Sequence, residues 1–191
     1  GARDRWLLGT DNQPYERRAS VDGVQKRDVY LVDARSGERT LVKQAVRGQA
    51  SLSPDGSHVM FWDDGNFHSY NVATKVITNI TAGAPTSFID TEDDHNVDRP
   101  STSVLGWSRD GKSALISDNY DVWRVGMAGK SWTNLTGNGR AERIRYSRFI
   151  NTDPRVRDLD LTKPLFMAAM QARTKKESIV RIDPGKPGAV S

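Results

Sequence analysis

An internal repeat is the feature that most restricts the fold of this sequence. The stretch Ser51–Gly83 recurs without a gap as Gly106–Asn138, at an offset of 55 residues. The match extends to its far end, where Thr78–Thr81 corresponds to Thr133–Thr136. A fixed period slightly longer than the ~40–50 residues of common propeller repeats indicates a fold built from copies of one supersecondary unit.

Each copy has the residue pattern of a four-stranded antiparallel unit. Ser53–Gly56 and Ser108–Gly111 are hairpin-turn signals, because Gly accepts positive φ and Asp hydrogen-bonds to nearby backbone amides. After each turn come three short runs rich in β-branched and aromatic residues, bounded by Asp, Asn and Gly. With the strand before the turn, they predict four antiparallel strands per copy, which is one blade of a β-propeller.

The segments that flank the two clear repeats fit the same template. Arg27–Asp33 and Glu177–Asp183 both match Tyr120–Gly126. The run Leu165–Arg173, which precedes the second of these segments, is compatible with a helix but favours a strand in this β context. The sequence therefore predicts an all-β fold, a β-propeller of roughly four blade-equivalents that is part of a larger ring. We expect one partial propeller domain over residues 1–191, with an inserted loop at 84–102 and blade-equivalents at about 1–45, 46–83, 101–138 and 141–185.

Composition excludes several classes of partner. The formal net charge is +4, but the Lys and Arg residues are scattered and no basic segment resembles a nucleic-acid-binding module, so we expect no nucleic-acid partner. The longest apolar run, Leu165–Met170, is far shorter than the ~18 residues of a membrane span. The absence of cysteine excludes disulfides and thiolate nucleophiles.

One stretch satisfies the pattern of a phosphate-binding loop, G-x-x-x-x-G-K-[ST]. This stretch is Gly106–Ser113. Such a loop must open a helix whose N-terminal amides hold the phosphates, whereas Lys112 here precedes the predicted strand Ala114–Ser117. The sister repeat has Ser57 in place of the lysine. We therefore interpret the stretch as a hairpin and expect no cofactor.

The sequence offers no set of catalytic residues. It contains no G-x-S-x-G nucleophile elbow, and its histidines His58, His68 and His95 lie apart. His58 and His68 fall in predicted strands, where a packing role is expected. The segment Asp90–Asp98 is dense enough in oxygen ligands for calcium, but it lacks the Gly and distal Glu of a calcium-binding helix-loop-helix, so a solvated acidic loop is expected and no metal is assigned.

The inserted loop is the part of the chain where we expect contact with a substrate. It is long, polar, acidic and richer in loop residues than any other connection, and long loops on rigid blades often carry function. The candidate substrate-binding residues are Glu92, Asp93, Asp94 and Arg99. A pair of acidic side chains among them is suited to hold the amino terminus of a peptide.

Several motifs together resemble the β-propeller part of large bacterial prolyl oligopeptidase family serine peptidases. The resemblance covers nearly the whole chain and rests on Gly106–Lys112, Asp118–Val125, Asn134–Arg140, Leu161–Leu165 and Thr174–Lys176. In that family an α/β-hydrolase domain follows the propeller and carries the catalytic serine, aspartate and histidine, none of which can be placed here. The resemblance implies a non-catalytic segment that gates and filters peptide access, with a peptide substrate and the α/β-hydrolase domain of the same full-length chain as partners. It also favours a periplasmic or secreted location.

Two other interpretations are open. A stand-alone propeller can act as a protein–protein binding module, as in the periplasmic Tol-system propeller, and an unrelated β-protein is the third possibility. A reading frame that continued past Ser191 to a serine elbow would favour the peptidase, and a stop codon would favour the binding module.

Overall fold

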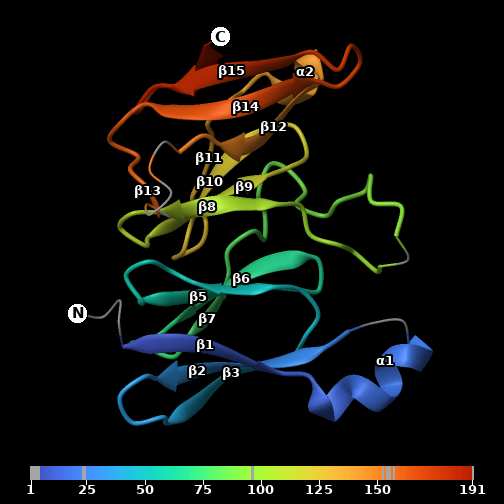
Figure 1. Cartoon of the computed structure of the whole chain (residues 1–191), viewed down its shortest axis with the longest axis vertical. Helices are drawn as coiled ribbons and strands as arrows, with labels where there is room; N and C mark the ends of the chain where they lie inside the picture. The colour runs from blue at the N-terminus through green and yellow to red at the C-terminus, as the bar shows by residue number, and fades with distance from the viewer. Residues whose placement is uncertain are drawn as a thin grey trace.

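Four β-sheets follow one another in chain order in the computed structural model (Figure 1). The structure describes residues 5–22, 25–95, 97–151, 153, 156 and 158–190. The first sheet contains β1 (Trp6–Asp11), β2 (Arg27–Asp33) and β3 (Arg39–Val46). The second contains β4 (Ala50–Leu52), β5 (His58–Asp63), β6 (Asn66–Asn71) and β7 (Ile77–Asn79).

The third and fourth sheets repeat this arrangement. The third contains β8 (Val104–Ser108), β9 (Ser113–Ser117), β10 (Val122–Gly126) and β11 (Trp132–Asn134), with β13 (Asp158–Leu159) added in parallel beside β8. The fourth contains β12 (Ile144–Phe149), β14 (Leu165–Gln171), β15 (Glu177–Ile182) and β16 (Ala189–Val190). All other neighbouring strands in these sheets are antiparallel. The apolar run at Leu165 is thus a strand, as its β context predicts.

The sheets stand in a row, with the first and fourth at opposite ends of the molecule (Figure 1). Successive sheets of three to five mainly antiparallel strands, stacked face to face, are the blades of a β-propeller, which confirms the predicted fold class. Because the end sheets lie far apart, the row does not close on itself. The chain is therefore a propeller segment.

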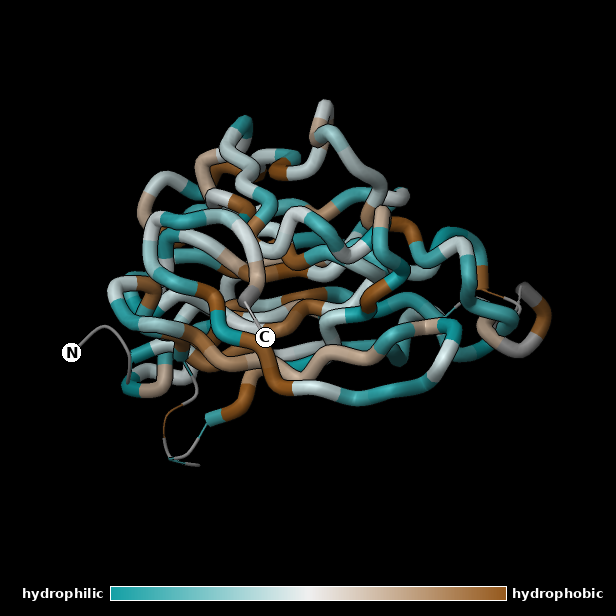
Figure 2. The backbone as a smooth tube through the Cα atoms, turned by 90° about the horizontal axis from the view of Figure 1, so that it is seen from above, coloured by the Kyte–Doolittle hydropathy of each residue, from teal (hydrophilic) through white to brown (hydrophobic). Residues whose placement is uncertain are grey.

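Clusters of buried side chains fill the spaces between neighbouring sheets. The first cluster joins the first and second sheets and includes Val29, Leu31 and Phe61. The other two join the second to the third sheet and the third to the fourth. Seen along the row, most hydrophobic stretches lie in the interior and the projecting loops are largely polar (Figure 2).

Burial on both faces explains the continuous apolar runs in the middle sheets. In β5, Val59 and Phe61 face the first sheet, whereas Met60 and Trp62 face the third. In β9, Leu115 packs toward the fourth sheet and Ile116 toward the second. In a strand that is buried on both faces, polar and apolar residues do not alternate, so the sequence of the strand is a continuous apolar run.

A polar position recurs at or next to the start of β2, β6 and β10. Asp28, Asn66 and Asp121 occupy equivalent places. Asp121 accepts a hydrogen bond from the Thr136 hydroxyl at 2.6 Å, as Asn66 does from the corresponding Thr81 at 3.2 Å. These bonds tie the strand to the segment that follows its blade. The repeat thus preserves a side-chain contact as well as a strand pattern.

The phosphate-loop pattern lies on a hairpin, as predicted. Gly106–Ser113 runs from β8 through a tight turn directly into β9, and the Gly111 amide donates to the Ser108 carbonyl at 2.9 Å. The amide of Lys112 donates to the Asp110 carboxylate at 3.1 Å, so that carboxylate occupies the place where a phosphate would need free amides. The geometry of a strand-to-helix phosphate loop is absent at this position.

Two features of the chain were not predicted from the sequence. A 3₁₀ turn (Gln13–Tyr15) and α1 (Glu16–Asp22) connect β1 to β2, and the one-turn α2 (Gly139–Glu142) precedes β12. The Tyr15 hydroxyl donates to the Asp28 carboxylate at 2.5 Å and holds the connection against the first sheet. The second feature is β13, which covers part of the edge of β8.

Candidate functional site

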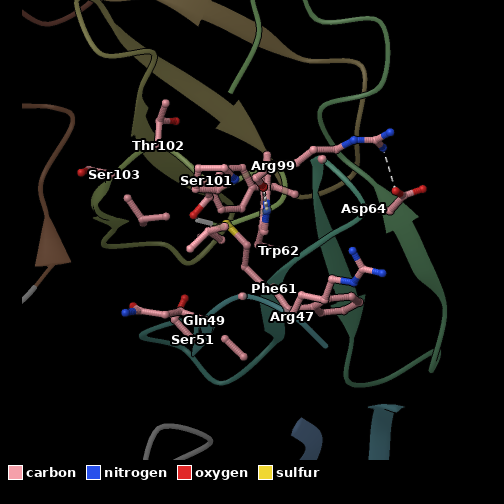
Figure 3. Close-up of a pocket in the computed structure, with 18 of the residues that line it drawn as sticks. Arg47, Gln49, Ser51, Phe61, Trp62, Asp64, Arg99, Ser101, Thr102 and Ser103 are labelled. Atoms are coloured by element: carbon pink, nitrogen blue, oxygen red, sulfur yellow. Dashed lines mark hydrogen bonds and ion pairs between the residues drawn. The ribbon is translucent and has the colours of Figure 1, made fainter. Parts of the chain in front are cut away.

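A cavity of about 860 Å³ lies between the second and third sheets and is the candidate site. Its walls come from β4, β5 and β8, and its roof comes from the end of the inserted loop, residues 97–102, together with Ser103. Gln49 and Ser51 lie on one side, with Ser101, Thr102 and Ser103 opposite (Figure 3). Because β4 and β8 are the first strands of their blades, the cavity lies where the innermost strands of a propeller surround its central channel.

The cavity combines an apolar base with a charged rim. Met60, Trp62 and Trp107 contribute apolar surface, and both indole N–H groups are already bound. The Trp62 Nε1 donates to the Arg99 carbonyl at 3.0 Å, and the Trp107 Nε1 donates to the Ser51 hydroxyl at 3.2 Å, which links the two inner strands. Such an apolar base with a few polar groups is typical of a ligand pocket.

The inserted loop is fixed to the second blade at its C-terminal end. Arg99 Nη1 donates to Asp64 Oδ1 at 2.9 Å, the pair joined by a dashed line in Figure 3. Arg47 Nη1 donates to Asp98 Oδ2 at 3.0 Å. These two ion pairs set the position of the roof above the cavity.

The N-terminal half of the loop is fixed to the third and fourth blades. The Thr86 hydroxyl donates to Asp118 at 2.8 Å, and Asn119 Nδ2 donates to Asp90 at 2.6 Å. Farther along the loop, Glu92 accepts a hydrogen bond from the Tyr120 hydroxyl at 2.9 Å. The other carboxylate oxygen of Glu92 forms an ion pair with Arg145 of β12. The loop therefore spans three blades and is held at each.

The structure does not bring the four predicted substrate residues together. Arg99 lines the cavity, whereas Glu92 binds Arg145 and Tyr120 at the other end of the loop. Asp93 accepts hydrogen bonds from the His95 amide and from its ring, which lower the pKa of that carboxyl. Asp94 is exposed, with its carboxylate 3.7 Å from the same ring.

The acidic loop places three potential metal ligands near one another. Asp93, Asp94 and His95 offer ligand atoms within 4.8 Å of one another, and all three are exposed. Asn96 of the same segment lies outside the described residues. The short bond between Asp93 and His95 accounts for the cluster without an ion, since exposed acidic residues are ordinarily solvated. The expectation of a solvated acidic loop at this segment stays a prediction.

Ser57 lies within hydrogen-bonding distance of both His58 and Asp55 at the turn after β4. These hydrogen bonds run in the opposite direction to those of a nucleophilic serine and its general base. Asn71 Oδ1 accepts two backbone amides, so its Nδ2 points to His58 Nε2 at 3.2 Å. His58 therefore carries its proton on Nδ1 and donates it to the Ser57 hydroxyl at 2.7 Å, which in turn donates to Asp55 at 2.8 Å. Burial lowers the pKa of His58, against the opposing charge of Asp55. His58 thus acts as a packing residue here, because a general base must accept the serine proton.

Sequence reasoning missed the residues that hold the loop and β13. Arg109 donates to Asp158 at 3.0 Å and to Asp160 at 2.8 Å, which ties β13 to the second clear hairpin turn. Leu159 packs over Gly106, where a Cβ would lie 2.9 Å from the leucine side chain. The first glycine of the phosphate-loop pattern is therefore favoured at this position, because a larger residue would require the Leu159 side chain to shift. No sequence signal links positions so far apart.

Comparisons with known proteins support the fold. No family model matches the sequence, and no curated protein matches it. Among solved structures, the chain is similar to dipeptidyl peptidase 4 from Porphyromonas gingivalis, with a TM-score of 0.57 and 13% identity over 87% of this chain. It covers 29% of that protein, so the likeness concerns a propeller segment of a larger molecule.

Two further solved structures are similar at lower scores. TolB from Acinetobacter baumannii has a TM-score of 0.49 and 19% identity, over 86% of this chain and 37% of its own. An oligogalacturonate lyase in complex with manganese has a TM-score of 0.44 and 11% identity, over 84% of this chain and 54% of its own. In the described part of this chain, no helix has the length and apolar character to cross a bilayer.

Proposed function

We propose that this chain is the non-catalytic propeller segment of a prolyl oligopeptidase-like serine peptidase, in which it gates and filters peptide access to an α/β-hydrolase domain. The observation that carries the proposal is the cavity at the inner strands, roofed by a loop fixed to three blades. A rigid opening of this kind admits an extended chain and excludes a folded protein. The fold likeness to a segment of a dipeptidyl peptidase is compatible with this role.

The candidate substrate residues divide into two groups under this proposal. Arg99 lies at the cavity and is the candidate most directly placed to meet a peptide. Glu92, Asp93 and Asp94 lie farther along the loop, where Glu92 already neutralises Arg145. For the proposed role in holding an amino terminus, the exposed Asp94 is the carboxylate freest to take part.

Hydrolysis assays on this chain and on the full-length protein test the proposed function. We expect the 191-residue chain to hydrolyse no chromogenic peptide, because its described residues contain no serine with a partnered base. We expect the full-length protein to hydrolyse short peptides, to lose this activity with a serine-directed inhibitor, and to leave folded proteins intact.

Either of two results would overturn the proposal. One is inhibitor-sensitive hydrolysis by the 191-residue chain itself. The other is a full-length protein without a serine elbow and without peptidase activity, which would support the binding-module interpretation.

A further inference from the structure

We propose that the open edge of β4 in the cavity binds an extended peptide that carries a carboxylate, held by main-chain hydrogen bonds and by Arg27. The inference deepens the proposed function and rests on it, because it names the ligand that the gating segment would hold. Three features of the cavity support it: the strand edge, the opposite wall and the charge of the rim.

The first feature is the edge of β4, which pairs with β5 on one side only in the described part of the chain. Ser53 N donates to the His58 carbonyl at 2.8 Å, and Trp62 N donates to the Gln49 carbonyl at 3.2 Å. Because inward and outward residues alternate in an antiparallel pair, the N–H and C=O of Ala50 point away from β5. Ala50 lines the cavity. An unpaired strand edge is a ready template for an added strand.

The second feature is the opposite wall. β13 pairs only with Trp107 and Ser108, so the preceding part of β8 has no strand beside its inner edge among the described residues. Leu105 and Gly106 of this part line the cavity. The cavity thus lies between two inner strands, and its volume of about 860 Å³ is within the range of pockets that enclose small ligands.

The third feature is an unpaired guanidinium among the described residues of the rim. Arg47 is paired with Asp98, and Arg99 is paired with Asp64. Arg27 also lines the cavity, yet its guanidinium forms no hydrogen bond or ion pair with any residue that the structure describes. A guanidinium binds a carboxylate through two parallel hydrogen bonds, so a carboxylate is the group that Arg27 is best suited to hold.

Calorimetric titration with a set of short peptides tests this inference on the 191-residue chain. The reference probe is acetyl-Thr-Val-Thr-Val-Thr with a free C-terminal carboxylate. The second peptide has the same sequence with a C-terminal amide and therefore lacks the carboxylate. The third peptide is this amide with its central threonine replaced by glutamate, so that the carboxylate lies on a side chain. A fourth peptide keeps the free carboxylate but has alternate amides N-methylated.

We expect the free acid to bind about tenfold more tightly than its amide, since a charge-assisted pair is lost. If the glutamate peptide recovers this affinity, the site accepts a side-chain carboxylate as well; if it does not, the site selects the C-terminus. N-methylation should weaken binding at least about tenfold, because each outward amide of the peptide loses its bond to the β4 edge.

Two variants locate the site. Arg27→Gln should abolish the preference for the acid over the amide. Ala50→Pro removes an outward N–H and should weaken the binding of every peptide. If Ala50→Pro fails to fold, the N-methylated peptide tests the same bond on the unaltered chain.

The inference is overturned if the free acid does not bind, if acid and amide bind equally, or if N-methylation has no effect. Calorimetry measures peptide binding and does not depend on hydrolysis. A negative binding result is therefore distinct from a negative result in the peptidase assay. A full-length protein without peptidase activity would overturn the peptidase role and leave a confirmed peptide site in place.

Discussion

Replacing Gly111 by alanine is expected to destabilise the protein by about 3–4 kcal/mol, the sum of backbone strain and overpacking. Gly111 has a φ of +68°, and a Cβ built on it would lie 2.0 Å from Asp55 Oδ1. Asp55 cannot move away cheaply, because the same oxygen accepts hydrogen bonds from the Ser53 hydroxyl and from both the amide and hydroxyl of Ser57. The two hairpin turns of the repeat therefore touch, and the contact requires glycine.

Gly37→Ala is the matched control for this contact. Gly37 has a φ of +74° and no atom within 4 Å of a built Cβ, so its replacement costs backbone strain alone, about 1–2 kcal/mol. Urea unfolding of both variants measures the difference. Equal destabilisation by the two substitutions would show that the turns of neighbouring blades do not touch in solution.

Asp121→Ala is expected to destabilise the protein by about 3–5 kcal/mol, because it leaves several buried donors unsatisfied. Asp121 is 4% exposed. Its Oδ1 accepts from the Thr136 hydroxyl at 2.6 Å and the Gly139 amide at 2.8 Å, and its Oδ2 accepts from the Arg140 amide at 3.2 Å. The carboxylate thereby joins the third blade to the start of the fourth.

Asp121→Asn separates hydrogen bonding from charge. An asparagine oxygen can keep the bonds from Thr136 and Gly139 and loses only the longer bond from Arg140, so we expect a cost of about 1 kcal/mol. Asn66 fills the equivalent position of the preceding blade with such an amide. Thermal unfolding of both variants checks the prediction. An asparagine variant as unstable as the alanine variant would contradict this explanation.

The sequence predicted the blades well because their determinants are local and repeated. Ser53–Gly56 and Ser108–Gly111 encode the turns in their own side chains, and buried runs such as Val59–Trp62 encode the strands. The inserted loop was recognisable by its length and polarity. Each of these signals lies within a few residues of the structure that it specifies.

The arrangement of the site could not be predicted, because its determinants are far apart in the sequence. The bond between Glu92 and Arg145 joins residues 53 positions apart, and that between Arg99 and Asp64 joins residues 35 apart. The residues next to Glu92 in the sequence do not show whether its carboxylate anchors the loop or binds a substrate. The two-residue strand β13 depends likewise on a neighbour that only the folded chain provides.

We expect these four sheets to belong to a larger propeller, in which their end faces pack against further blades. The end sheets carry apolar residues on their outward faces. Phe166 and Ile179 of the fourth sheet are 47% and 63% exposed, and Leu7 and Leu41 of the first are 59% and 44% exposed. By strand register, Phe166 and Ile179 share the face opposite the buried Met167. Unpartnered apolar faces of this kind favour association.

Multi-angle light scattering of the 191-residue chain over a range of concentrations tests this claim most directly. We predict self-association that increases with concentration, and a marked decrease in the double variant Phe166→Thr, Ile179→Thr, which removes apolar surface without touching the cores between blades. A monodisperse monomer at every concentration, unchanged in the double variant and melting in one cooperative transition, would contradict the account and show that the four sheets form a complete domain.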